Sequence, residues 1–304
     1  MLPALIYGNA EIEDTFAEIF EMWVSRVLIT AENEKWALKA AEVATGFASS
    51  IIGSPTEAGI ERLIPPEETP DGRVGALVQF YHHTRSDLKR QMIARIGQCV
   101  MTCPTTAAFN ALGGAARKLK VGRSLRFFGD GFQKLDELYG RMVWRIPVME
   151  GEFIVENSFG VKKGVAGGNF FIMARNQKSG LAAAEAAVEA IRRNVRDVIM
   201  PFPGGICRSG SKVGSLKYKI PASTNHLYCP TLKGKLSESR VPDGVNTIYE
   251  IVINGLNLES VKAAMAEGIK AAVNVPGVVK ISAGNYEGRL GAFKVYLSEL
   301  IKGV

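Results

Sequence analysis

Hydrophobic and polar positions along the chain follow two periods, one typical of helices and one typical of strands. The elements that these periods predict occur in the same order twice. In the first half they are, in chain order, a strand at 26–30, a helix at 34–45 that ends at Gly46, a strand at 50–53, a strand at 75–82, a helix at 86–97 and a strand at 98–103. In the second half they are a strand at 169–174, a helix at 181–194, a strand at 198–200, a strand at 246–253, a helix at 258–273 and a strand at 277–282.

The repeated order is strand, helix, strand, strand, helix, strand, which is the split βαβ motif of a ferredoxin-like α/β sandwich. The sequence therefore predicts an α+β protein, a duplicated ferredoxin-like sandwich with two lobes. The alternative is a doubly wound parallel sheet, which would need longer runs of strict strand–helix alternation.

The boundary between the halves is expected near Glu150 and Gly151, between two strand-like runs and after a hairpin-like turn at 129–131. We expect an N-terminal ferredoxin-like lobe at 1–150 and a C-terminal ferredoxin-like lobe at 151–304. The second half is longer between its two helices, and the extra length forms an enlarged loop at 207–245.

One acidic residue, Glu250, interrupts the apolar strand at 248–253. Side chains alternate between the two faces of a strand, and both faces of this strand are otherwise apolar, so we expect it to be buried on both sides. An ionised carboxylate is costly there, and the pKa is expected to rise so that the proton is kept at neutral pH. A neutral carboxylic acid can donate a hydrogen bond to developing negative charge. The alternative is a structural glutamate paired with an arginine or a lysine.

Two long loops, at 54–72 and 201–245, are candidates for function because long irregular segments in compact domains are usually functional. The second contains Ser209-Gly210-Ser211-Lys212, which has the hydroxyls, glycine and lysine of an anion-binding loop. It lacks the spacing of a Walker A motif, and a plain exposed turn is an equal interpretation. The glycines at 167 and 168 either let a ligand approach the backbone or form a tight turn. No Ser-His-Asp arrangement is evident.

Composition narrows the class of protein. The chain has 304 residues, of which 47% are hydrophobic, and a net charge of +7. No run of about 18 apolar residues occurs, so we expect no membrane span, and the start of the chain lacks the basic region of a signal peptide. A cytoplasmic location is expected. The basic residues are not gathered in an arm and no nucleic-acid-binding motif accompanies them, which favours a small anionic ligand over nucleic acid. Simple solubility is the other interpretation of the charge.

Metal and disulfide chemistry find little support in the sequence. Cys99 and Cys103 are expected on one strand face, too far apart for easy bridging, as buried reduced thiols. Cys207 and Cys229 are expected to be unpaired. His82 and His83 would face opposite sides of a strand, and no third ligand is evident, so no metal site is expected.

A set of sequence runs spread over nearly the whole chain closely resembles the formylmethanofuran:tetrahydromethanopterin formyltransferase family. The runs are E-I-E-D-T-F (11–16), R-V-L-I-T-A (26–31), P-P-E-E-T-P-D-G-R (65–73), R-I-G-Q-C-V-M-T (95–102), F-F-G-D-G (127–131), E-G-E-F-I-V-E (150–156), G-V-A-G-G-N-F (164–170), P-F-P-G-G-I (201–206), S-G-S-K-V-G (209–214), P-A-S-T-N (221–225), Y-E-I-V-I-N-G-L (249–256) and P-G-V-V-K-I-S-A-G-N (276–285).

The resemblance implies a cytoplasmic enzyme of one-carbon metabolism, such as methanogenesis, with two ferredoxin-like lobes and neither prosthetic group nor metal. Such an enzyme moves a formyl group reversibly between methanofuran and tetrahydromethanopterin, which are coenzyme substrates. It forms homodimers that pair into homotetramers. In this family the methanofuran cleft lies at a subunit interface, with the pterin in a shallower cleft beside it.

Formyl transfer between two amines passes through a tetrahedral intermediate with an oxyanion, and the resemblance implies that Glu250, protonated, is the catalytic residue that stabilises it. Polar side chains inside the matched runs are predicted to bind the substrates: Gln98, Asn169, Ser209, Ser211, Lys212, Thr224 and Asn225. Two rival hypotheses keep the fold and change the role. One is a non-catalytic or scaffold subunit of a formyltransferase/hydrolase complex, and the other is a ligand-sensing repeat protein.

Overall fold

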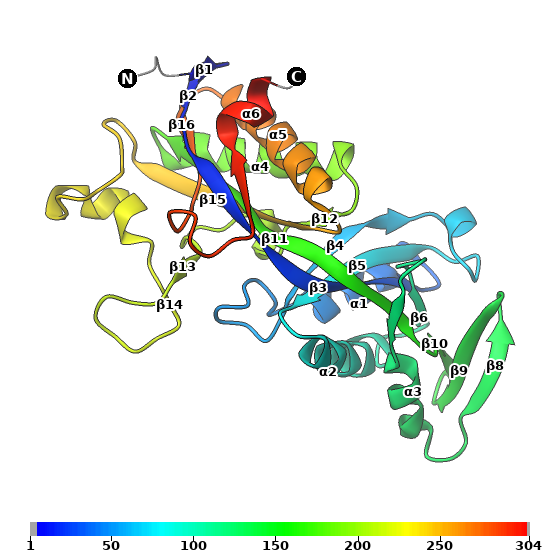
Figure 1. Ribbon diagram of the computed structural model, residues 1–304. Helices are drawn as coiled ribbons and strands as arrows, with labels where there is room; N and C mark the ends of the chain where they lie inside the picture. Colours follow the sequence, from blue (N-terminus) through cyan, green and yellow to red (C-terminus); the bar gives the residue numbers. More distant parts are fainter. Residues whose placement is uncertain (1–4, 303–304) are drawn as a thin grey trace. The chain divides into compact units, whose positions relative to one another are not determined.

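The fold is that of a computed structural model, which describes residues 5–302 (Figure 1). The chain forms two compact units. One contains the residues up to Glu21 and those from Gly164 onward, and the other contains Met22–Lys163. The chain passes from one unit to the other inside two long strands, β3 (Phe16–Thr30) and β11 (Phe159–Ala174). The first of these units is therefore built from two separate stretches of sequence and the second from one, whereas the predicted division at residue 150 gives two sequence halves and stays a prediction.

The unit formed by 22–163 contains a split βαβ sheet. Its strands run in the spatial order β6 (Ala107–Asn110), β3, β5 (Gly75–His82) and β4 (Glu57–Ile64), and each neighbouring pair is antiparallel. In order along the chain these are the fourth, first, third and second strands. Helices α1 (Glu34–Thr45) and α2 (Arg85–Arg95) bury alanines and large apolar residues against this sheet.

The same unit carries further strands beyond β6. β10 (Gly151–Glu156) pairs with β6 in parallel, and β9 (Arg141–Val148) and β8 (Lys134–Leu138) follow as antiparallel neighbours. The start of β11 pairs with β7 (Arg117–Leu119). The remaining helical segments are the 3-10 helices Pro66–Glu68 and Arg126–Gly129, the π-helix Ile96–Val100 and α3 (Val121–Leu125).

The other unit repeats the sheet. β16 (Val278–Ser282), β11, β15 (Thr247–Gly255) and β12 (Val198–Ile199) are antiparallel neighbours in that spatial order, again the fourth, first, third and second strands of the motif. β2 (Ala10–Ile12) extends the sheet beside β16, and β1 (Leu5–Tyr7) lies beside β2. The shared order confirms the predicted α+β class and the duplicated ferredoxin-like fold.

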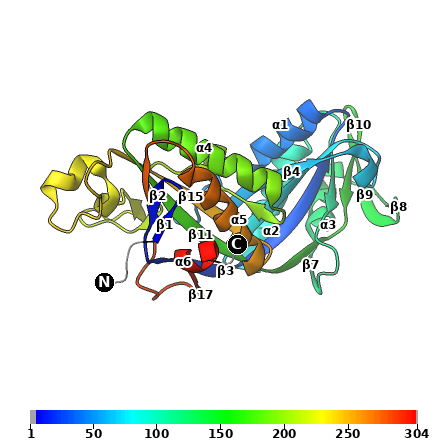
Figure 2. The ribbon, with the colours of Figure 1, turned by 90° about the horizontal axis from the view of Figure 1, so that it is seen from above.

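Two long helices cover one face of this second sheet. α4 (Gln177–Asn194) and α5 (Leu258–Val273) pack side by side (Figure 2) and bury small and branched side chains against β11 and β15. The first helix of each unit and α5 all begin at an asparagine, namely Asn33, Asn176 and Asn257, whose side chain accepts a hydrogen bond from a first-turn N–H. The predicted helices at 34–45 and 258–273 are confirmed at both ends.

The C-terminal part of this unit is less regular. β17 (Phe293–Tyr296) pairs with Phe16–Ile19 of β3 and leads into α6 (Leu297–Lys302). Segment 207–245, partly yellow in Figure 1, holds only the hairpin β13 (Lys212–Val213) and β14 (Ala222–Ser223) and the 3-10 helices His226–Tyr228 and Pro230–Lys235. A further 3-10 helix, Pro203–Gly205, precedes it. This irregular segment covers the residues of the predicted enlarged loop.

Four local predictions are wrong. Residues 50–53 form a turn, and the second strand of the motif is β4 instead, so residues 57–64 of the first candidate loop are strand. Residues 98–103 are not a strand but continue α2 as a π-helix and a turn, and β6 is the fourth strand. The apolar run there fits a buried helix as well as a strand. The hairpin turn lies not at 129–131 but at Tyr139 and Gly140, both with positive φ, between β8 and β9.

Candidate active site

Glu250 lies near the middle of β15, and its side chain points away from α4 and α5. Its neighbour Ile251 belongs to the core beneath the helices, whereas Glu250 shares the opposite face with Ile248 and lies opposite Phe171 of β11. The Glu250 backbone also exchanges two hydrogen bonds with Cys207, with N···O distances of 2.8 and 2.9 Å. The side chain is 2% exposed. The expectation that this strand is buried on both faces is confirmed at Glu250.

One residue, Ser211, satisfies the Glu250 carboxyl group. The backbone N–H of Ser211 donates to Oε2 at 2.8 Å, and the hydroxyl donates to Oε1 at 2.7 Å. Within residues 5–302, no arginine, lysine or histidine forms an ion pair with this carboxyl. The structural ion pair that the sequence left open is therefore not what the structure contains.

Burial raises the pKa of Glu250 to about 7, because losing hydration costs the carboxylate more than the two hydrogen bonds from Ser211 return. The neighbouring groups also favour their neutral forms. Burial, helped by the charge of Glu250, raises the pKa of the Cys207 thiol and of the Tyr286 phenol. The site is thus a buried, weakly acidic carboxyl group surrounded by neutral donors.

Most of the predicted binding residues lie in the irregular segment that carries Ser211. Ser209 places its hydroxyl 3.5 Å from Cys207 Sγ and 3.4 Å from the carbonyl oxygen of Gly210. Thr224 Oγ1 lies 3.1 Å from Cys229 Sγ, and the Asn225 N–H donates to the Ser209 carbonyl at 3.4 Å. The structure therefore brings these residues together around the β13–β14 hairpin.

The Lys212 side chain is bonded within its own hairpin. Its ammonium group donates to the Ser223 hydroxyl at 2.9 Å and lies 3.4 Å from the Gly214 carbonyl oxygen. These contacts close the hairpin on itself. A role of Lys212 in substrate binding stays a prediction.

Asn169 lies on β11, and both polar atoms of its side chain form hydrogen bonds within the protein. Its Nδ2 donates to the carbonyls of Gly167 and Gly284, each at 3.0 Å, and its Oδ1 accepts from the Gly284 N–H at 2.6 Å. The asparagine thus ties β11 to the turn that follows β16. Gly167 and Gly168 lie within β11 at a β-bulge rather than before the strand, and Gly167 takes the left-handed φ of +87°.

Gln98 belongs to the other unit, where its side chain is exposed on the π-helix. Its backbone carbonyl accepts from the Thr102 hydroxyl at 2.7 Å. Its role in substrate binding stays a prediction.

Two family sequence models match the chain. The one described as formylmethanofuran-tetrahydromethanopterin formyltransferase matches residues 5–148, and the one described as FTR, proximal lobe, matches residues 151–300. The formylmethanofuran–tetrahydromethanopterin formyltransferase of Methanocaldococcus jannaschii is 60% identical over 295 residues, which is 96% of this chain and 98% of that protein. The enzyme of the same name from Methanopyrus kandleri is 57% identical over 297 residues, 96% of this chain and 99% of that protein.

Solved structures agree. The formyltransferase of Methanosarcina barkeri superimposes with a TM-score of 0.93 at 52% identity, covering 98% of this chain and all 100% of that one. The chain belongs to the formylmethanofuran–tetrahydromethanopterin formyltransferase family. The resemblance read from the sequence is confirmed, and the protein is a transferase. A chain of the formyltransferase/hydrolase complex of Methylorubrum extorquens, solved with methylofuran, also superimposes at 0.93, with 41% identity and coverage of 98% and 99%.

Sequence reasoning missed two residues next to the site of this formyltransferase-family chain. Glu18 of β3 is 1% exposed, and Tyr286, in the loop after β16, reaches Ser211 with its hydroxyl. Glu18 interrupts an apolar strand as Glu250 does, so the same signal was present in the sequence. Its partners lie more than 260 residues away along the chain, which local patterns cannot indicate.

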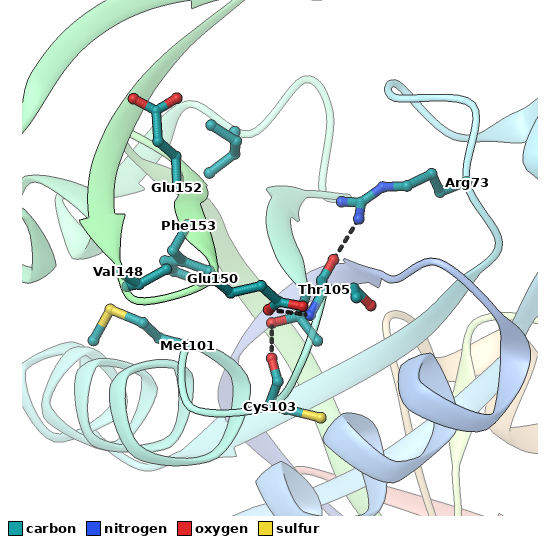
Figure 3. Close-up of a pocket in the computed structure, with 10 residues that line it drawn as sticks. Arg73, Met101, Cys103, Thr105, Val148, Glu150, Glu152 and Phe153 are labelled. Atoms are coloured by element: carbon teal, nitrogen blue, oxygen red, sulfur yellow. Dashed lines mark hydrogen bonds between the residues drawn. The ribbon is translucent and has the colours of Figure 1, made fainter.

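A separate cavity of about 230 Å³ lies in unit 22–163 (Figure 3). Arg73 and Glu150 both reach Thr105 there: the Arg73 guanidinium donates to the Thr105 carbonyl, and Glu150 Oε2 accepts from the Thr105 N–H at 2.8 Å. Cys103 and Phe153 also line it. Because the charged groups are already bonded to protein, we do not assign the chemistry to this cavity.

Metal and membrane features can be stated for residues 5–302. No three side chains among His, Cys, Asp and Glu gather there in a way that would hold a metal ion. All four cysteines are free thiols, with Cys207 buried and the other three half-buried. None of the helices in the described part of the chain has the length and apolar character needed to cross a membrane.

Proposed function

We propose that this protein transfers a formyl group reversibly between formylmethanofuran and tetrahydromethanopterin, with Glu250 as the catalytic acid. The relatives that carry this activity in their names align over nearly the whole chain. The observation that carries the proposal is the Glu250 carboxyl group, which is buried, is bound by Ser211 and has a pKa of about 7.

The reaction needs no side-chain nucleophile. The pterin amine nitrogen attacks the formyl carbon, a C–N bond forms, and the carbonyl electrons move to oxygen as an oxyanion. The Glu250 O–H donates to that oxygen. The intermediate then collapses: the C=O bond re-forms, the bond to the methanofuran nitrogen breaks, and the proton lost by the attacking amine is taken up by the departing one. The reverse transfer follows the same steps backwards.

Ser211 has a defined part in this scheme. Its N–H donates to Oε2 and its hydroxyl donates to Oε1, so the single O–H of the protonated acid stays available for the substrate oxygen. The carboxyl is held in one orientation before the substrate arrives, which is what makes a donor effective on an oxyanion. Removal of one such donor typically costs about 2.7–4 kcal/mol, or roughly 10²–10³ in kcat.

The remaining assignments follow from the same proposal. The coenzymes are bound with help from the seven polar residues named from the sequence, their anionic tails are attracted by the net charge of +7, and no prosthetic group is required. The protein works in the cytoplasm as a homodimer or a homotetramer built from dimers.

The scaffold hypothesis is not favoured. The chain is 60% and 57% identical to proteins named as the formyltransferase itself, and 41% identical to the chain from the formyltransferase/hydrolase complex. A scaffold would also have no need of a buried acid. The ligand-sensing hypothesis loses its support for the same reasons.

The test is formyl transfer between the two coenzymes by wild type, Glu250→Gln and Glu250→Leu. We expect E250L to lose roughly 10²–10³ in kcat, with E250Q between it and wild type because an amide still donates a hydrogen bond. Both variants should melt as cooperatively as wild type. Full activity in E250L would contradict the catalytic role, and an inactive wild type would revive the scaffold hypothesis.

A further inference from the structure

We propose that Glu18 and Tyr286 are positioning residues for Glu250, acting through Ser211. The inference rests on the proposed function, because it concerns the residues that hold the acid. It connects an acid on β3 with an acid on β15 through one loop and three consecutive sets of hydrogen bonds, all within the same unit.

The first set joins Glu18 to loop 285–291. The Glu18 carboxylate accepts four backbone N–H groups: those of Tyr286 at 2.6 Å, Gly288 at 3.1 Å, Gly291 at 2.6 Å, and Leu290. Glu287 and Gly288 both have positive φ, which turns the chain back around the carboxylate. The loop thus wraps around the buried Glu18 side chain. Its backbone N–H groups bind the carboxylate in the way that clustered N–H groups of other proteins bind an anion.

The Glu18 carboxyl group is held in its charged form, which favours binding of loop 285–291. Burial alone would raise its pKa, but the four N–H donors outweigh burial and lower the pKa below the ordinary value. Glu18 is therefore ionised at neutral pH, and a charged acceptor binds the loop more strongly than a neutral one.

The second set joins the loop to Ser211. The Tyr286 hydroxyl donates to the Ser211 carbonyl oxygen at 3.1 Å. The Tyr286 ring is in turn packed edge-on by Phe20, with centroids 6.5 Å apart. Because Glu18 and Phe20 belong to the same strand, β3 fixes both the backbone and the ring of Tyr286.

The third set is the pair of bonds from Ser211 to Glu250. The segment around Ser211 is irregular apart from the two-residue strand that follows it, so few other backbone bonds restrain it. The other restraints near Ser211 are the pairing of Lys212 with Ser223, including a 2.9 Å bond from the Lys212 ammonium group to the Ser223 hydroxyl, and the 3.4 Å bond from the Asn225 N–H to the Ser209 carbonyl. The Tyr286 hydroxyl therefore holds the carbonyl side of the residue whose N–H and hydroxyl orient the acid.

The gentlest test is Tyr286→Phe, which keeps the ring against Phe20 and removes only the donor. We expect kcat to fall by about tenfold while KM for both coenzymes stays within about twofold, because the change affects an acid that acts in the transition state. The matched control is Tyr296→Phe, whose ring packs on Phe16 and lies outside this chain of bonds; it should match wild type. Glu18→Gln should show the same split between kcat and KM, with a larger loss.

The decisive comparison repeats Tyr286→Phe in the E250L background. If Tyr286 acts through Glu250, the second substitution lowers kcat no further there. An equal loss in both backgrounds, a rise in KM alone, or wild-type kcat in Tyr286→Phe would each overturn the inference. Failure of the proposed function would give a different result: the single variant E250L would be fully active. Melting curves of every variant exclude loss of folded protein as the cause, and Tyr286→Phe remains informative if Glu18→Gln does not fold.

Discussion

At the scale of single residues, two buried glutamates on strands of the same unit have pKa values shifted in opposite directions. Glu18 accepts four backbone N–H groups, and its pKa is lowered. Glu250 accepts one N–H and one hydroxyl, and its pKa is raised to about 7. Two causes account for the difference: Glu18 has four donors that favour its charged form where Glu250 has two, and burial opposes the charged form more strongly at Glu250. The difference agrees with the two proposals, in which Glu18 anchors a loop and Glu250 is the acid.

Ser211→Ala should change the pH dependence of the reaction. The acid must be protonated to donate, so wild-type kcat should fall as the pH rises through about 7. The Ser211 hydroxyl lowers the pKa of Glu250, so its removal should move that fall to higher pH while the plateau rate drops. Measured pH–rate profiles check this, with Ser209→Ala as the control, since the Ser209 hydroxyl bonds Cys207 and Gly210 instead. A fall that moves to lower pH would refute the explanation.

The sequence was sufficient to predict that Glu250 is a buried acid, because a charged residue inside an apolar strand is visible in the local pattern. Ser211 was found only as one polar residue of a matched run, with no indication that it binds Glu250. Glu18 gave the same local signal and was missed. Its proposed role depends on the N–H groups of residues 286–291, which become its partners only in the folded protein. Long-range backbone contacts of this kind leave no trace in a single sequence.

At the scale of elements, the helices were the most predictable part of the chain. α1 and α5 combine a periodic apolar face with an asparagine cap, so periodicity and capping agree on where they begin. The missed strand β4 contains Glu57 and Glu61, two buried acids that made it resemble a polar loop. Glu61 is paired with Arg26 of β3, and this partner was not visible in the sequence.

Gly168→Ala should destabilise the packing of α5 on β11. A methyl group at Gly168 would lie 2.3 Å from Val261 Cγ1 and 3.3 Å from the Ile253 carbonyl oxygen. Overpacking of this kind typically lowers the free energy of unfolding by about 1–3 kcal/mol. Denaturant unfolding measures the loss, and Gly234→Ala, where no atom lies within 4 Å, is the matched control. Equal stability of the two variants would show that the helix can move away at little cost.

At the scale of the whole molecule, the duplication places one split βαβ sheet in each unit with the same strand order. The repeat was predictable because both copies keep the order of elements. The crossing of the chain between units inside β3 and β11 was not, because the sequence pattern predicted only residues 26–30 of β3 and 169–174 of β11, which lie on one side of each crossing.

The net charge of +7 leads to a prediction about association with the anionic coenzymes. Long-range attraction is screened beyond about 10 Å at an ionic strength of 0.1 M. We therefore expect kcat/KM for each coenzyme to fall as salt is raised, with kcat nearly constant. A neutral osmolyte at the same osmolality should have little effect. If kcat/KM rose with salt, electrostatic steering would be ruled out.

The central claim is that Glu250 is a neutral acid in the folded protein, and its own titration tests that claim most directly. Infrared difference spectra of wild type minus Glu250→Gln report the protonated carboxyl group as a function of pH. We predict a carboxylic-acid band that persists up to neutral pH and disappears with a midpoint of about 7. A band that has already vanished near the ordinary glutamate pKa of about 4.3 would contradict the account.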